Sequence, residues 1–178
     1  MRPVRYNVAA SLDGYIAGPN GEFDWIPMDP DIDFDALFRG VDTVLLGRST
    51  YEVVLRDPAA PAWPKGSRIF VFSRTLRAAD HPGVTIVAEN AAGVVAALRE
   101  EASGGDIWLF GGAALFGSLL AAGQVDRVEV TVIPILLGGG ISMLPAGSVR
   151  ALLALQHIEQ YSSGQVSLHY AVANARSP

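Results

Sequence analysis

Twice in this chain, an apolar run ends at glycine just where a helical pattern begins. The first case is residues 45–51 (LLGRSTY), and the second is residues 110–113 (FGGA). Glycine carries no side chain, so another molecule can approach its backbone closely. The first N–H groups of a helix have no partners inside the helix and favour an anion. Two such junctions predict a nucleotide cofactor that lies across the ends of a sheet.

Strand and helix patterns alternate along the chain, which predicts an α/β domain with a largely parallel sheet. The expected strands are residues 4–10, 42–46, 68–72, 84–87, 107–110 and 127–133. The expected helices are one that opens at Pro30–Asp31 and stops at Gly40, then residues 48–55, 91–101 and 113–122. Residues 152–161 and 165–173 predict a closing antiparallel pair at the sheet edge. Segments rich in glycine or proline predict loops at residues 15–25, 56–66 and 136–140.

Composition limits the possible function classes. A chain of 178 residues, half of them hydrophobic and 17% charged, is expected to form one domain with a full core. The formal net charge of −5 argues against a general nucleic-acid binder, which needs a basic face. The absence of cysteine excludes disulfides, thiolate catalysis and cysteine-ligated metals, and the histidine spacing fits no metal motif.

The start of the chain runs into a strand pattern without the apolar core of a signal peptide. The longest apolar stretches, near residues 113–122 and 130–137, are too short or too broken to span a bilayer. We therefore expect a cytoplasmic protein without a membrane partner.

Three common α/β site motifs are missing. The first strand is followed by Ser-Leu-Asp-Gly rather than the G-x-G-x-x-G of dinucleotide-binding folds. The P-loop spacing and the G-x-S-x-G nucleophile elbow are absent as well. A different kind of nucleotide site is therefore favoured.

The order of the motifs resembles a known superfamily. A strand leads to SLDGYIA at residues 11–17, and an acidic helix follows. Later strands end in Gly-Arg-Ser-Thr-Tyr, Ser-Arg and Gly-Gly-Ala. A further strand contains a threonine, and Leu-Leu-Gly-Gly-Gly follows it. This order resembles the dihydrofolate reductase fold. It is most similar to the reductase domain of the bifunctional riboflavin-biosynthesis deaminase–reductase and its stand-alone relatives, over nearly the whole chain. The resemblance implies a three-layer fold around a mostly parallel sheet with an antiparallel C-terminal edge.

The resemblance also implies NADPH as the cofactor, and it assigns residues to each part of that molecule. These are Gly47, Arg48, Ser49 and Thr50 at the first phosphate site, Ser73 and Arg74 at the adenosine 2′-phosphate, Gly111, Gly112, Ala113 and Phe116 at the pyrophosphate turn and its helix, and Ala10 and Ile16 beside the nicotinamide. The two arginines favour NADPH over NADH, because a 2′-phosphate gains charge-assisted hydrogen bonds that a ribose hydroxyl cannot match.

The chain departs from the family pattern on the substrate side. The deaminase half with its zinc motif is absent, and no basic set for a ribose phosphate is evident near the substrate loop. Folate reductases carry a helix acid before the Gly-Arg strand, and Asp31 stands sixteen residues before Gly47 in a similar place. The substrate and its pathway therefore stay open.

Five further residues are candidates on the substrate side, each with a structural alternative. Asp13 suits a turn but is expected to point its carboxylate into the cleft, where it would promote protonation of the substrate. Asp31 suits a helix start, yet it also matches the acid that positions an aminopyrimidine ring. Thr131 suits a strand, although the resemblance places it under the substrate ring. Trp25 and Tyr51 are either core aromatics or rings that stack on a planar substrate.

The favoured function is hydride transfer from NADPH to a C=N or C=O carbon of a small pyrimidine-, pterin- or sugar-derived substrate. The expected reaction is similar to that of 5-amino-6-(5-phosphoribosylamino)uracil reductase or of dihydrofolate reductase. Two alternatives are a dinucleotide-binding module without turnover and a dimeric regulatory protein whose final strand pair is the interface. A hydrolase is disfavoured because no Ser/His/Asp order is evident. The apolar edge strand predicts a homodimer.

Overall fold

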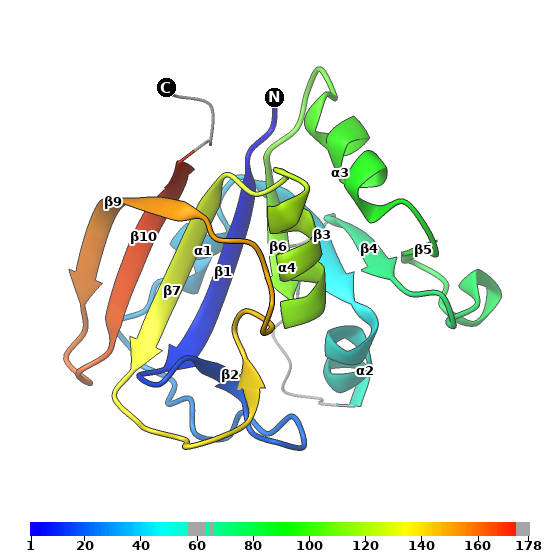
Figure 1. The fold of residues 1–178 in the computed structure, drawn as a ribbon. Helices are drawn as coiled ribbons and strands as arrows, with labels where there is room; N and C mark the ends of the chain where they lie inside the picture. Colours follow the sequence, from blue (N-terminus) through cyan, green and yellow to red (C-terminus); the bar gives the residue numbers. More distant parts are fainter. Residues whose placement is uncertain (57–62, 65, 174–178) are drawn as a thin grey trace.

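A twisted sheet of eight strands forms the centre of the computed structural model, which describes residues 1–56, 63–64 and 66–173 (Figure 1). The sheet has the strand order β5-β4-β3-β6-β1-β7-β10-β9. Its strands are β1 (Val4–Ser11), β3 (Val41–Gly47), β4 (Arg68–Phe72), β5 (Thr85–Val87), β6 (Asp106–Gly111), β7 (Arg127–Ile133), β9 (Leu152–Gln160) and β10 (Val166–Ala173). The helices are α1 (Phe34–Phe38), α2 (Arg48–Arg56), α3 (Ala91–Arg99) and α4 (Ala113–Ala121), with a short 3₁₀ turn at Ala78–Asp80.

The predicted fold class is confirmed. All neighbouring pairs from β5 through β7 are parallel. Strand β10 pairs antiparallel with β7 and with β9, which forms the C-terminal edge. The parallel strands all end on the same side of the sheet, so the loops after β1, β3, β4, β5 and β6 gather there.

The sheet is covered by helices on both faces, because its central strands are apolar at successive positions. In β6, Ile107 and Leu109 pack with α3 and α4, whereas Trp108 between them joins a second core on the opposite face. The same alternation places Leu45 in the first core and Val44 in the second. Figure 1 shows α3 and α4 in front of the sheet and α1 behind it.

Two local predictions need correction. The helix expected to open at Pro30–Asp31 begins only at Phe34, because Asp33 is its N-cap and accepts a hydrogen bond from Ala36 N at 2.9 Å. The loop expected at residues 15–25 contains β2 (Tyr15–Ala17), which pairs as a small second sheet with β8 (Ile141–Ser142), a strand for which there was no prediction. The predicted proline-rich loop at residues 56–66 lies largely outside the described residues. Within the described part of the chain, no helix is long and apolar enough to cross a membrane.

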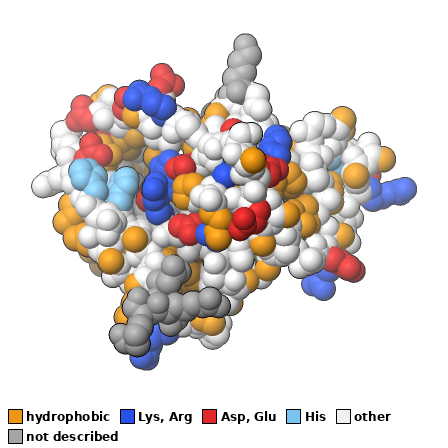
Figure 2. Space-filling model, turned by 90° about the horizontal axis from the view of Figure 1, so that it is seen from above, with side chains coloured by type: hydrophobic (Ala, Val, Ile, Leu, Met, Phe, Trp, Pro, Cys, Tyr) orange, Lys and Arg blue, Asp and Glu red, His pale blue; other side chains and the backbone are white. Residues whose placement is uncertain are grey.

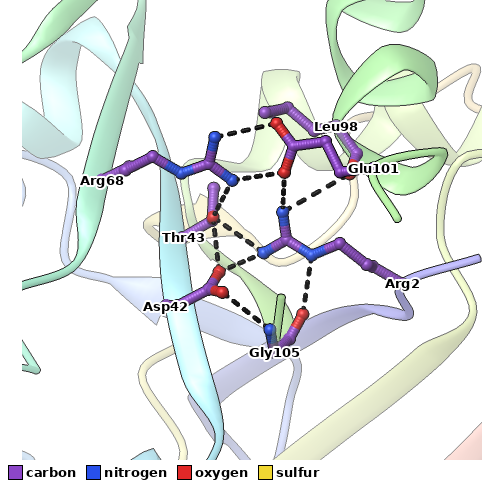
Figure 3. Close-up of polar contacts among 7 residues, drawn as sticks. All are labelled: Arg2, Asp42, Thr43, Arg68, Leu98, Glu101 and Gly105. Atoms are coloured by element: carbon purple, nitrogen blue, oxygen red, sulfur yellow. Dashed lines mark hydrogen bonds and ion pairs between the residues drawn. The ribbon is translucent and has the colours of Figure 1, made fainter. Parts of the chain in front are cut away.

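A buried arginine joins four segments at the amino ends of the parallel strands (Figure 3). The Arg2 side chain is only 4% exposed, and its guanidinium forms ion pairs with Asp42 and Glu101. It also donates to Thr43 Oγ1 at 2.9 Å and to the Gly105 carbonyl at 2.9 Å. Each of its nitrogens has a partner, so the cost of burying the charge is offset.

A second arginine strengthens this network from β4. Arg68 donates to both carboxylate oxygens of Glu101, at 2.8 and 2.6 Å, and to Thr43 Oγ1 at 3.1 Å. Hydrogen bonds from Arg68, with the charges of both arginines, lower the pKa of Glu101 to about 2. The contribution of Glu101 to stability is therefore complete above its ordinary pKa and is lost as the pH falls toward 2. Figure 2, which looks down on this end of the molecule, shows acidic and basic side chains intermingled at the surface.

We expect Arg2→Met to lower the free energy of unfolding by about 3 kcal/mol, because it leaves Asp42, Thr43 and a carbonyl without their buried donor. The matched control is Arg127→Met, since Arg127 is 52% exposed and lies 3.7 Å from Asp106. It should cost less than about 0.5 kcal/mol. Urea denaturation of the two variants measures the difference. Equal losses would mean that the buried network adds nothing beyond a surface ion pair.

Candidate functional site

A large cavity opens at the carboxyl ends of the parallel strands. Its volume is about 1680 Å³. Its walls come from the ends of β3, β4, β5 and β6, from the first turns of α2 and α4, and from β1 and β7. This is where open α/β sheets bind their ligands, because loops and helix starts from several strands converge there.

The two glycine junctions predicted from the sequence meet in this cavity. A Cβ atom added at Gly47 would lie 3.3 Å from the backbone nitrogen of Gly112. A Cβ atom at Gly112 would lie 2.9 Å from Thr50 Oγ1, closer than side chains tolerate. Gly111 has φ +154°, a backbone region that other residues rarely adopt. The end of β3 and the end of β6 therefore pack together so closely that any side chain at Gly47 or Gly112 would have to displace a neighbour.

The start of α4 presents free donors to the cavity. Its N-cap is Gly112, which has no side chain to accept from the first-turn N–H groups. Gly112, Ala113 and Ala114 all line the cavity. The first intrahelical bond recorded there runs from Phe116 N to the Gly112 carbonyl at 3.0 Å. The preceding N–H groups are therefore available to an anion, and the helix dipole favours one.

Two arginines border the cavity near the start of α2 and the end of β4, and they differ in how they are paired. Arg48 donates to Glu52 one turn later on α2, at 3.0 Å. Arg74 is exposed, and no ion pair or hydrogen bond joins it to another of the described residues. Ser73 Oγ accepts from Thr75 N at 3.2 Å and Leu76 N at 3.1 Å, so it forms the turn that carries Arg74.

An aromatic wall lines the other end of the cavity, and sequence reasoning missed it. Phe38, Trp108 and Phe110 all contribute to it. Ring centroids lie 4.7 Å apart for Phe38 and Trp108, and 5.0 Å apart for Trp108 and Phe110. The indole nitrogen of Trp108 is buried without a hydrogen-bond partner. Alternation in β6 could have pointed to Trp108 and Phe110, because both lie on the face opposite Leu109.

Polar side chains from two central strands contribute to the same end. Thr131 of β7 lines the cavity, as predicted from the family resemblance, and so does Asn7 of β1, which was not predicted. Asn7 Nδ2 donates to the buried carboxylate of Glu129 at 3.0 Å. The Asn7 carbonyl oxygen is therefore the end of the amide left to face a ligand. Gln165 also lines the cavity, and its Nε2 donates to the Pro27 carbonyl at 3.5 Å.

Most of the residues predicted for cofactor binding lie together on the cavity wall. Those that line it are Ile16, Gly47, Arg48, Ser49, Thr50, Ser73, Arg74, Gly111, Gly112 and Ala113. Two others do not line it, since both face the core between the sheet and α4. Ala10 is 2% exposed on β1, and Phe116 is 2% exposed with its ring stacked on Tyr6 at 3.8 Å.

The two aromatics predicted to stack on a substrate lie elsewhere as well. Tyr51 is 6% exposed in the second core, and its hydroxyl lies 3.3 Å from His81 Nδ1. Trp25 does not line the cavity, and its indole N–H donates to the Glu22 carbonyl at 3.1 Å. The helical period explains Tyr51, because it turns this residue of α2 toward the sheet.

The two predicted acids are held outside the cavity wall. The Asp13 carboxylate accepts from Ser11 Oγ at 2.6 Å, Leu137 N at 3.1 Å and Gly138 N at 2.7 Å. The expectation that it points into the cleft is therefore wrong, because it binds the glycine-rich loop instead; its catalytic role stays a prediction. Asp31 is not the helix cap, and its carboxylate accepts from Ser162 Oγ at 2.7 Å at the β9–β10 turn.

We expect Asp13→Ala to loosen the loop at residues 136–140, because the Leu137 and Gly138 N–H groups lose their acceptor. Amide hydrogen exchange should become faster at these two positions, whereas the control Asp31→Ala should leave them unchanged. The hydroxyl of Ser11, together with the backbone N–H groups of Gly138 and Leu137, lowers the pKa of Asp13. The contact is therefore present above the ordinary pKa of a carboxyl and is lost as the pH falls through the lowered value. Unchanged exchange in Asp13→Ala would contradict this role.

Comparison with known proteins identifies the family. Residues 2–167 match the model of the RibD C-terminal domain. The chain belongs to the RibD C-terminal domain family. RibD C-terminal domains are reductase domains of riboflavin biosynthesis, so the predicted resemblance to the deaminase–reductase family is confirmed.

Some relatives match this RibD C-terminal domain over nearly their whole length, whereas others are longer proteins of which it matches only a part. YwjB of Bacillus subtilis is 35% identical, and the match covers 93% of this chain and 95% of YwjB. The riboflavin biosynthesis protein RibD of Mycobacterium tuberculosis is 29% identical over 78% of this chain, but the match covers only 44% of RibD. A putative riboflavin biosynthesis protein from Shewanella sp. PV-4 has a structure with a TM-score of 0.81 and 25% identity, covering 98% of this chain and all of that one.

Proposed function

We propose that this RibD C-terminal domain is an NADPH-dependent reductase of a small planar or sugar-derived substrate. One observation supports the proposal above all. The two glycine junctions lie against each other in one cavity, and the start of α4, which no side chain caps, lines that cavity. When bound there, the nicotinamide cofactor supplies a hydride to a C=N or C=O carbon. The protein binds, orients and protonates the reactants.

The residues of the cavity fit the anionic parts of such a cofactor. The N–H groups of Ala113 and Ala114 suit the pyrophosphate, because no side chain caps the helix start. Thr50 and Ser49 add hydroxyls from the facing helix, α2. Arg74 suits the 2′-phosphate of the adenosine, because its guanidinium is free of internal partners among the described residues.

The cavity has room for a second molecule beside the cofactor. Its volume of about 1680 Å³ exceeds the roughly 300–1,000 Å³ that hold one drug-sized ligand. The adenosine and phosphate groups would occupy the part over β4, β3 and β6, which directs the nicotinamide toward β1. The substrate would then lie over β1 and β7, against the aromatic wall.

The chemistry of that part of the cavity favours a flat substrate with hydrogen-bonding edges. Phe38, Trp108 and Phe110 offer apolar surfaces for a ring. The Thr131 hydroxyl would donate to a ring nitrogen or carbonyl oxygen, and the Asn7 carbonyl would accept from a ring N–H. Oxidised pterins and aminopyrimidines carry both kinds of edge, and the Thr131 hydroxyl is placed to protonate the heteroatom next to the reduced carbon.

We expect NADPH to bind at least about tenfold more tightly than NADH, which needs only about 1.4 kcal/mol. Arg74→Ala should abolish most of this preference by weakening NADPH alone. The matched control is Arg48→Ala, because Arg48 is already paired with Glu52 and should contribute less. Titration calorimetry of both cofactors with the wild type and the two variants gives the required affinities.

Equal affinities for NADPH and NADH in the wild type would remove the role of the 2′-phosphate. Failure to bind either dinucleotide would favour the alternative of a regulatory protein. Binding without oxidation of NADPH, in the presence of oxidised pterins, aminopyrimidines and small carbonyls, would favour a module without turnover.

We further propose that two copies of the chain associate through the face of β9. Leu153, Leu155 and Ile158 lie opposite Val172, Tyr170 and Leu168 in the register of β10. They are 43%, 50% and 53% exposed, so the sheet edge offers a continuous apolar surface. Surfaces of this kind are usually covered by a partner.

The double variant Leu155→Glu, Ile158→Glu should be monomeric, because charged side chains are costly to bury in such a contact. Sedimentation velocity of the variant and the wild type measures the association. The control is Gln156→Glu, which adds one of the same charges at the neighbouring position. A monomeric wild type would refute the proposed homodimer and leave the cofactor proposal untouched.

A further inference from the structure

A row of polar side chains leads from the cavity toward the molecular surface through β7 and β10. Thr131 lines the cavity, and its hydroxyl donates to Ser167 Oγ at 3.4 Å. Ser167 Oγ lies 3.1 Å from Nε2 of His169. The other ring nitrogen, Nδ1, lies 3.9 Å from Glu129 Oε1. The antiparallel register opposes Thr131 with Ser167 and Glu129 with His169, so all four side chains share one face of the sheet.

Glu129 provides a fixed negative charge beside this histidine. It is 3% exposed, and it accepts from Arg5 Nε at 3.0 Å and from Asn7 Nδ2 at 3.0 Å. Burial alone would raise the pKa of Glu129, but the hydrogen bonds from Arg5 and Asn7 and the charge of Arg5 lower it below the ordinary value. The carboxylate therefore stays ionised and stabilises a positive charge on the neighbouring imidazole.

His169 connects this row to solvent. Its side chain is 29% exposed, and its ring packs edge-on against His157 with centroids 5.4 Å apart. Figure 2 shows a pair of histidine side chains at the surface. The titratable and charged groups that share this face are Glu129 and Arg127 on β7, Arg5 on β1, Asp106 on β6, and His157 and Glu159 on β9. Arg5 and Arg127 are both paired with carboxylates, so Glu129 is the charge that directly faces Nδ1.

The order serine, histidine and glutamate is also that of a hydrolase triad, but the geometry does not suit nucleophilic attack. Ser167 is 4% exposed and lies behind Thr131 rather than on the cavity wall. Strand β10 is paired on both sides, so its backbone N–H groups belong to the sheet and cannot form an oxyanion hole. A hydroxyl held between a histidine and a second hydroxyl is suited instead to passing a proton.

We propose that Glu129, His169 and Ser167 form a proton relay that reaches the substrate through Thr131. The proposal rests on the proposed reductase function. For transfer, the Thr131 hydroxyl rotates from Ser167 toward the substrate, and the Ser167 hydroxyl rotates toward Thr131. Hydride addition to the C=N or C=O carbon moves the π electron pair onto the heteroatom, which takes the Thr131 hydroxyl proton. Ser167 replaces that proton, the imidazolium of His169 replaces the Ser167 proton, and solvent reprotonates the imidazole. Glu129 is a positioning residue that stabilises the imidazolium.

The test compares turnover and binding in variants of the relay. His169→Gln and Ser167→Ala should each lower kcat by about a hundredfold, the range of general acid catalysis. NADPH affinity, followed by quenching of the tryptophan fluorescence, should stay within about twofold of the wild type. The matched control is His157→Gln, which removes the adjacent imidazole without touching Ser167, and it should keep the wild-type kcat.

Two further measurements separate a relay from a structural role. The wild-type rate should fall as rising pH removes the imidazolium proton, and this limb of the pH profile should disappear in His169→Gln. Added imidazole should restore part of the rate to His169→Ala, but none to Ser167→Ala, because the link to Thr131 is then missing.

The outcomes distinguish this proposal from the one on which it rests. If the wild type reduces substrate and His169→Gln keeps both its rate and its pH profile, the relay is refuted and the reductase function stands. If His157→Gln lowers the rate as much as His169→Gln, with a lowered melting temperature in both, the effect is structural and the relay is refuted. If the wild type oxidises no NADPH with any substrate of the panel, the reductase function fails and the relay fails with it.

Discussion

The close approach of the ends of β3 and β6 determines the shape of the cavity. Gly47 and Gly112 bring two backbones nearly into contact, and Thr50 packs over the second glycine. Both helices that follow begin at this point, so their first turns face the same space. A side chain at Gly47 would press on the backbone of Gly112, and one at Gly112 would press on the Thr50 side chain. The cavity, the exposed donors of α4 and the position of Arg48 all depend on this contact.

Much of the fold could be predicted from the sequence, because the signals are local. Apolar runs that end in glycine marked β3 and β6, and the helix expected from residue 91 begins there as α3. The start of the helix at residues 34–38 was predicted too early, and the pairing of Tyr15–Ala17 with Ile141–Ser142 was not predicted. Two-residue and three-residue strands carry too little pattern to be recognised, and their partners lie far apart in the chain.

Residues of the candidate site were predictable where glycine or arginine marks the end of a strand. They were less predictable where the face of a helix or strand decides whether a side chain lines the cavity or a core. Phe116 and Tyr51 sit on helices that start at the cavity, but the helical period turns both toward a core. Alternation in β6 assigns Trp108 to a face without showing that this face borders the cavity, and nothing local distinguishes Asn7 and Ser167 from other strand residues. Only the register of β1, β6, β7 and β10 brings them beside the cavity or behind Thr131. Register depends on contacts between distant segments, so it lies beyond local patterns.

The network around Arg2 and the cavity occupy opposite ends of the same strands. Arg2, Asp42 and Arg68 secure the amino ends, whereas the glycine junctions lie at the carboxyl ends. Since none of the described residues takes part in both, evolution can remodel the loops around the cavity while the interactions that secure the sheet stay unchanged. A family built on this sheet can therefore acquire new substrates by changing residues 18–33 and the loop after β7, without first finding compensating mutations elsewhere.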